Sequence, residues 1–98
     1  MTDGVRRLSR GLRRLATYWW WNRYPPKQVY VTFGEFCAIK ETINDDLGCD
    51  FGMINGTMHF QRIPVLIGTD AQVDAQRTTK PEHQDAMKMI AADFAGAV

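Results

Sequence analysis

The sequence predicts an α+β fold in which a small, mostly antiparallel sheet packs against two helices and a basic amphipathic helix stands at the N-terminus. Three observations lead to this prediction. Apolar residues recur at helical spacing in three segments, short β-branched or aromatic runs lie between them, and an Asn-Gly pair separates two of those runs. The 98 residues, 45% of them hydrophobic, suffice for one small domain core.

The first expected element is a helix over residues 4–20. Its apolar residues are spaced by three or four positions, which places them on one stripe of a helix. They are Val5, Leu8, Leu12, Leu15 and Trp19. Pro25 and Pro26 end the segment. We therefore divide the chain into a basic helical arm, residues 1–24, and a compact α+β domain, residues 25–98.

A strand and a capped helix are expected next. Residues 28–32 read Gln-Val-Tyr-Val-Thr, a β-branched and aromatic run typical of a strand. Thr32 and Glu35 have the spacing of a capping box and predict the start of a helix over residues 33–47. Gly48 then stands where a left-handed cap would end that helix.

The following segment predicts a hairpin and a further strand. Asn55 and Gly56 favour a type I′ turn between strands 51–54 and 57–60. Residues 63–67 form the next expected strand. Because Pro64 lacks an amide hydrogen, we expect an edge strand there, unless the proline stands at a bulge or at the first position.

The C-terminal part is expected to hold a loop and a helix. Residues 68–80 are polar and rich in turn-forming residues, which predicts a loop. Thr79 and Glu82 again have the capping spacing, and they predict a last helix over residues 81–94. That helix would present an apolar stripe to the core.

The charge of the chain is divided unevenly along it. Residues 1–27 hold seven basic residues against one acidic residue, and residues 28–98 hold five against ten. The formal charges are therefore +6 and −5, which indicates that the arm has a partner of its own. The candidate residues for binding nucleic acid or another anion are Arg6, Arg7, Arg10, Arg13, Arg14 and Arg23. The alternative is that these arginines form the solvated side of a helix that docks by its leucines.

Three consecutive tryptophans follow the arginines. Consecutive side chains on a helix point about 100° apart, so the three indoles cannot share one face. Trp and Arg are common anchors of protein interfaces. The candidate partner-binding residues are Leu8, Leu12, Leu15, Trp19, Trp20, Trp21 and Tyr24. In the alternative interpretation, Trp19 packs inside while Trp20 and Trp21 cover the edge of the sheet, and nothing binds.

The sequence contains no recognisable catalytic or metal-binding motif. Its two cysteines and two histidines lack the paired spacing of a zinc site. No nucleophile motif, P-loop or dinucleotide fingerprint occurs. We therefore expect a protein that is not an enzyme and that has no cofactor or bound metal. It also lacks a secretory signal and a run of about 20 apolar residues, so we expect a cytoplasmic protein, or one that acts inside an infected cell.

The pieces from Val29 to Asp70 resemble a segment of tailed-phage proteins. They are the Val-Tyr-Val strand, the helix from Phe33, the glycine turn, the hairpin, the Ile-Pro-Val strand and the Thr-Asp loop. Similar strings occur in small phage proteins and near the end of the central domain of tailed-phage major capsid proteins. The chain is too short to be a complete major capsid protein. The resemblance therefore implies a phage accessory or virion component, and it assigns no functional residues.

These observations lead to two functional hypotheses. The first is a non-enzymatic interaction protein of phage type that binds a protein partner or virion neighbours through its Arg- and Trp-rich arm. It would be a minor virion or assembly component, or a small inhibitor of a host complex. The second is a nucleic-acid-binding protein that uses the arm as an electrostatic clamp. A membrane surface and a second copy of the chain are further alternative partners.

Overall fold

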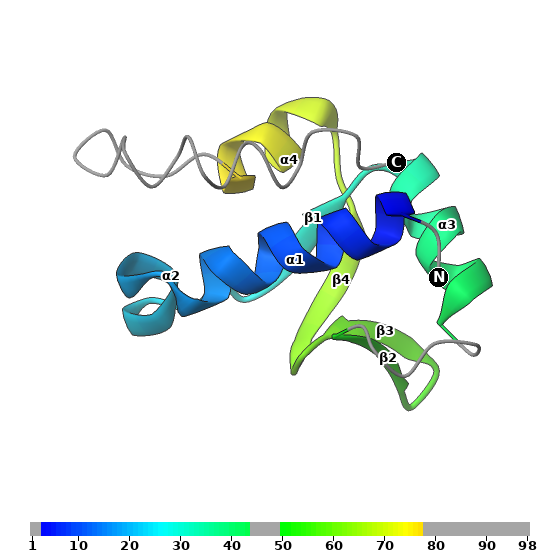
Figure 1. Ribbon diagram of the computed structural model, residues 1–98, viewed down its shortest axis with the longest axis horizontal. Helices are drawn as coiled ribbons and strands as arrows, with labels where there is room; N and C mark the ends of the chain where they lie inside the picture. The colour runs from blue at the N-terminus through cyan, green and yellow to red at the C-terminus, as the bar shows by residue number, and fades with distance from the viewer. Residues whose placement is uncertain (1–2, 44–49, 78–98) are drawn as a thin grey trace.

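A computed structural model of the chain describes residues 3–43 and 50–77 (Figure 1). Within these residues the fold is α+β, as predicted, with a helix at the N-terminal end. The elements are α1 (Asp3–Thr17), α2 (Trp19–Arg23), β1 (Val29–Val31), α3 (Phe33–Thr42), β2 (Phe51–Ile54), β3 (Thr57–Phe60), β4 (Ile63–Ile67) and α4 (Asp70–Arg77). No described helix is long and apolar enough to span a bilayer.

The described strands form one mixed sheet in the order β1-β4-β3-β2. The β2–β3 and β3–β4 pairs are antiparallel, and the β1–β4 pair is parallel. The predicted edge position of β4 is therefore wrong. Ile63 and Pro64 pair with β3, whereas pairing with β1 begins at Val65. Pro64 is tolerated inside the sheet because it stands where β4 changes from one neighbour to the other.

The hairpin formed by β2 and β3 confirms the local prediction. Phe51 pairs with Phe60 and Ile54 with Thr57, which leaves two residues for the turn. Asn55 and Gly56 have φ angles of 53° and 80°. Positive φ at both turn positions is the requirement of a type I′ turn, and asparagine and glycine meet it at low cost.

The single helix predicted over residues 4–20 is two helices. Tyr18 has a ψ of 145°, so the chain is extended there and α2 starts in a new direction. The apolar stripe of α1 consequently ends at Leu15 and does not continue to Trp19. Trp21 is buried instead, with 7% of its surface exposed.

The start of α3 is the predicted capping box. The Thr32 hydroxyl accepts from the Glu35 amide at 3.1 Å, and the Thr32 amide donates to Glu35 Oε1 at 2.8 Å. Ile39 is fully buried on the inner side of this helix. α3 ends at Thr42, and the rest of the predicted helix, with Gly48, lies outside the described residues.

Part of the predicted loop over residues 68–80 is the helix α4. The segment is polar, and Val73 is its buried apolar residue, so its periodicity is weak. Thr69 and Gln72 nevertheless form a reciprocal cap, with Thr69 N to Gln72 Oε1 at 2.8 Å and Gln72 N to Thr69 Oγ1 at 3.2 Å. The Thr-x-x-Gln spacing therefore marks this helix start. The helix predicted over residues 81–94 lies outside the described residues.

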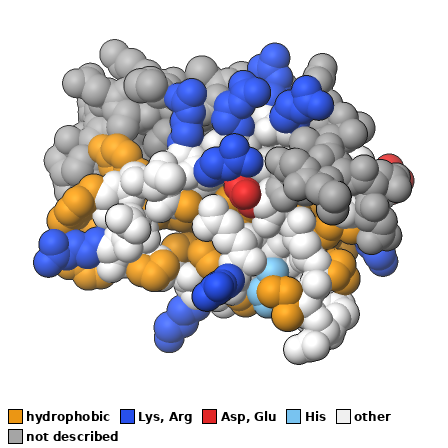
Figure 2. All heavy atoms as spheres, turned by 60° about the horizontal axis from the view of Figure 1, so that its bottom comes forward, with side chains coloured by type: hydrophobic (Ala, Val, Ile, Leu, Met, Phe, Trp, Pro, Cys, Tyr) orange, Lys and Arg blue, Asp and Glu red, His pale blue; other side chains and the backbone are white. Residues whose placement is uncertain are grey.

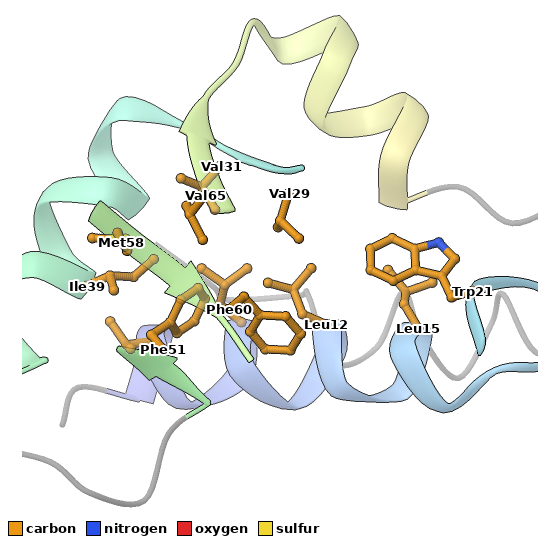
Figure 3. Close-up of a cluster of buried hydrophobic side chains, with 12 residues drawn as sticks. Leu12, Leu15, Trp21, Val29, Val31, Ile39, Phe51, Met58, Phe60 and Val65 are labelled. Atoms are coloured by element: carbon orange, nitrogen blue, oxygen red, sulfur yellow. The ribbon is translucent and has the colours of Figure 1, made fainter. Parts of the chain in front are cut away.

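One hydrophobic core joins the N-terminal helices to the sheet. Figure 3 shows Leu12 of α1 below Val29 and next to Phe60, with Trp21 of α2 next to Leu15. Residues on both sides of the expected boundary at position 24 belong to this cluster. The arm is thus docked, and its apolar stripe supplies part of the core of the domain.

The free edge of β1 is covered by α4, which lies alongside that strand (Figure 1). The Gln76 side chain accepts from the Tyr30 amide at 2.6 Å and donates to the Gln28 carbonyl at 2.7 Å. One side-chain amide thereby takes the place of a peptide group from a neighbouring strand. Pairing of this kind protects an edge strand from other chains.

Candidate functional site

The buried side of α1 is occupied by its leucines. Leu8, Leu12 and Leu15 each have 0% of their surface exposed. The prediction that these three residues anchor a partner is therefore corrected, because a side chain in the core of the folded chain cannot contact another molecule. Burying a leucine contributes about 1.5–3 kcal/mol to folding, which is the role the structure gives them.

The exposed side of α1 carries five arginines. We name this surface the arginine face, and its members are Arg6, Arg7, Arg10, Arg13 and Arg14. At 100° per residue they occupy a sector of about 120° opposite the leucines. Figure 2 shows Lys and Arg side chains gathered at the top of the view, with one acidic side chain just below. The structure thus brings five of the six predicted anion-binding residues together.

Arg10 stands at the centre of the arginine face. Its neighbours at three and four positions in both directions are all arginines, and these are the side chains that adjoin it on a helix. Neither Arg6 nor Arg10 forms an ion pair within residues 3–43 and 50–77. Like charges at this spacing destabilise a helix slightly, so the face has an electrostatic cost that a bound anion would relieve.

Arg13, near the C-terminal end of this face, forms an ion pair with Asp50. Its Nε lies 2.7 Å from Asp50 Oδ2, and both side chains are partly exposed to solvent. The Asp50 carbonyl also accepts from the Gln61 amide at 2.8 Å. The end of the arginine face is thereby tied to the turn between β3 and β4.

An aromatic cluster with one arginine lies at α2. Trp19 and Tyr24 are 56% and 53% exposed, and their rings meet edge to face with centroids 6.4 Å apart. The Arg23 guanidinium lies 5.4 Å from the Trp19 ring centroid and 6.0 Å from that of Tyr24. Such cation–π contacts hold the arginine against the aromatic surface.

The predicted tryptophan anchors therefore occupy different environments. Trp20 is half-buried and packs on Tyr24 at 4.7 Å between ring centroids, whereas Trp21 belongs to the core. The inference that the three indoles cannot share a face is confirmed. The alternative that placed Trp19 inside is wrong, because the extended Tyr18 turns Trp21 inwards instead.

A cleft of about 290 Å³ lies between α2 and the β3–β4 turn. Its lining residues are Ala16, Trp21, Asn22, Pro25, Pro26, Gln61 and Ile63. Sequence reasoning missed this cleft, because its walls come from segments that are far apart in the chain. Gln61, with a φ of 55°, has a left-handed backbone that its residue type does not signal.

The other residues considered for chemistry remain isolated or lie outside the described residues. Cys37 is partly buried as a free thiol, and His59 Nδ1 lies 2.8 Å from the Thr57 carbonyl oxygen. Cys49 and His83 fall outside the described residues. That the chain is not an enzyme and needs no metal or cofactor stays a prediction.

We compared the chain with models of known protein families, with curated protein sequences and with solved structures. None of the three comparisons found a match. The arginine face, the aromatic cluster and the cleft are the features of the described residues that bear on function.

Proposed function

We propose that this chain is a non-enzymatic nucleic-acid-binding protein that holds the phosphate backbone against the arginine face of α1. The observation that carries this proposal is five exposed arginines on one side of a helix whose other side is buried. The leucines were the main apolar anchors expected for a protein partner, and they are in the core. Their burial favours the electrostatic alternative of the two functional hypotheses.

The arginine face suits a phosphate backbone in chemistry and in length. Guanidinium groups present paired donors to phosphate oxygens and stay charged at all physiological pH values. From Arg6 to Arg14 the helix rises about 12 Å, at 1.5 Å per residue. A row of charges of this length can contact several successive phosphates, and each contact releases counterions from the nucleic acid.

The test is the affinity for a fluorescent single-stranded oligonucleotide, measured by anisotropy at low salt. We expect the double variant Arg6→Gln/Arg10→Gln to bind about tenfold more weakly than the native chain. The matched control is Lys27→Gln/Lys40→Gln, which removes the same charge from two exposed residues that are not on α1. It should lose no more than about twofold. Equal losses in the two variants, or binding to anionic phospholipid vesicles alone, would reject the proposal.

A second candidate function is supported by the exposure of Trp19 and Tyr24. Two half-exposed aromatic rings with Arg23 against them resemble the anchors of a protein interface. The protein would then be a phage-type interaction protein, a minor virion or assembly component or an inhibitor of a host complex. A nuclease-treated pull-down at high salt should retain a defined partner with the native chain. The variant Trp19→Ser/Tyr24→Ser should lose that partner.

A further inference from the structure

The cleft beside α2 adjoins the arginine face. Ala16 belongs to α1 and lines the cleft, one turn beyond Arg13. Arg13 pairs with Asp50, and the Asp50 carbonyl accepts from the amide of Gln61, which lines the opposite wall. A strand whose phosphates lie on the arginine face therefore passes the mouth of the cleft.

The walls of the cleft combine flat apolar surfaces with two amide side chains. Pro25 and Pro26 supply apolar ring surfaces beside the exposed margin of Trp21, which is otherwise buried in the core, and Asn22 and Gln61 supply carboxamides. Each carboxamide has both a donor and an acceptor. A nucleobase matches this arrangement, because it has a flat face that stacks on apolar rings and an edge that carries both donors and acceptors.

We propose that this cleft takes one unpaired base of a nucleic-acid strand whose backbone lies on the arginine face. The inference rests on the proposed function and adds the kind of nucleic acid that the site recognises. The volume of about 290 Å³ lies just below the range for drug-sized ligand sites, about 300–1,000 Å³, which suits a single ring system. A base inside a duplex is stacked and paired, so the occupant is an unpaired base.

The backbone of Gln61 is a second reason to assign a role to this turn. Left-handed φ angles are uncommon for residues other than glycine, and asparagine, as at Asn55, adopts them more readily. A glutamine in this conformation is strained by about 1 kcal/mol or more, and such strain concentrates at functional sites. Gln61 lines the wall of the cleft at a position where glycine would be easier for the backbone.

The test compares two labelled strands of the same length and charge, a normal oligodeoxynucleotide and one in which all positions are abasic. The native chain should bind the normal strand about tenfold more tightly. Gln61→Gly should bind both strands with the weaker affinity of the abasic strand, since it removes the carboxamide and relaxes the turn. Asn55→Gly is the control, because it replaces a carboxamide residue of positive φ by glycine in the β2–β3 turn. This variant should still bind the normal strand more tightly than the abasic strand.

Each outcome of this test bears on one of the two proposals. Equal binding of the two strands by the native chain would overturn the base site and leave the backbone clamp intact. The same conclusion would follow if Gln61→Gly lost equal affinity for both strands. Failure of the native chain to bind either strand at low salt would overturn the proposed function and the base site together. A thermal melt of both variants, with transitions near that of the native chain, establishes that the comparison is between folded proteins.

Discussion

Arg77 and Glu35 form a two-point ion pair that fastens α4 to the start of α3. Arg77 Nη1 lies 2.9 Å from Glu35 Oε2, and Arg77 Nη2 lies 2.7 Å from Glu35 Oε1. The Glu35 side chain is 3% exposed and the Arg77 side chain 15%, so solvent screens the pair weakly. Glu35 Oε1 also closes the capping box with the Thr32 amide. One carboxylate thus supports both the local cap and the long-range contact.

Loss of Arg77 should therefore destabilise the chain strongly. Arg77→Met leaves the Glu35 carboxylate buried without its cation, and we expect the free energy of unfolding to fall by about 3–5 kcal/mol. In a Glu35→Gln background the same substitution should cost far less, because the introduced carboxamide is neutral and its oxygen can still accept from the Thr32 amide. Urea unfolding of the two single variants and the double variant gives the coupling energy. Additive losses would show that the pair contributes nothing.

Gln76 should slow the exchange of the Tyr30 amide hydrogen with solvent at the outer edge of β1. Gln76→Ala removes its two hydrogen bonds to Gln28 and Tyr30, and we expect a loss of about 1–3 kcal/mol in unfolding free energy. The Tyr30 amide should exchange its hydrogen faster in this variant. Gln76→Glu keeps the acceptor for that amide and serves as the comparison. Unchanged exchange of the Tyr30 amide in Gln76→Ala would contradict the assigned role.

The two sides of α1 should respond to substitution in opposite directions. Arg10→Gln removes a cation surrounded by four others, and unfolding free energy should stay level or rise by about 0.5 kcal/mol. Leu12→Ala opens the core and should cost about 2–5 kcal/mol. Thermal denaturation of Arg10→Gln and of Leu12→Ala measures both changes in stability. Strong destabilisation by Arg10→Gln would show that the arginine has a structural role and would remove the reason to regard it as a binding residue.

The elements that the sequence predicts well are those fixed by local chemistry. The Asn55-Gly56 turn requires positive φ angles, and the Thr32–Glu35 cap requires two side chains three positions apart, so each is readable within a few residues. α4 was missed although Thr69 and Gln72 form the same kind of cap, because a polar segment has little apolar periodicity. The side chains that hold α4 in place, Gln76 and Arg77, bind residues that are distant in the sequence.

The arrangement of the sheet and of α1 depends on contacts that a linear pattern does not report. The spacing of the leucines shows that α1 has an apolar stripe, but the same stripe suits a partner or the core of the chain itself. The position of β4 between β1 and β3 likewise follows from pairing over long sequence separations. Tertiary packing determines both the burial of the α1 leucines and the position of β4. For this reason, residues expected at an interface lie in the core.

Of the candidate site, the sequence predicts the arginine face but not the cleft. The arginines follow from helical periodicity, since a buried stripe leaves the opposite side of α1 to solvent. The cleft unites Trp21 with Gln61, and their proximity arises from the fold alone. Trp21, and not Trp19, is buried in the core because the backbone is extended at Tyr18. No residue type in that segment predicts this break in the helix.

The salt dependence of oligonucleotide affinity is the decisive measurement for a phosphate clamp on the arginine face. For single strands the slope of log K against log salt is about −0.7 per phosphate neutralised, so the contacts of Arg6 and Arg10 alone contribute about −1.4. Arg6→Gln/Arg10→Gln should make the slope shallower by about 1.4, because two contacts are lost. A native slope near zero, or a slope that stays the same in the variant, would contradict a phosphate clamp on the arginine face.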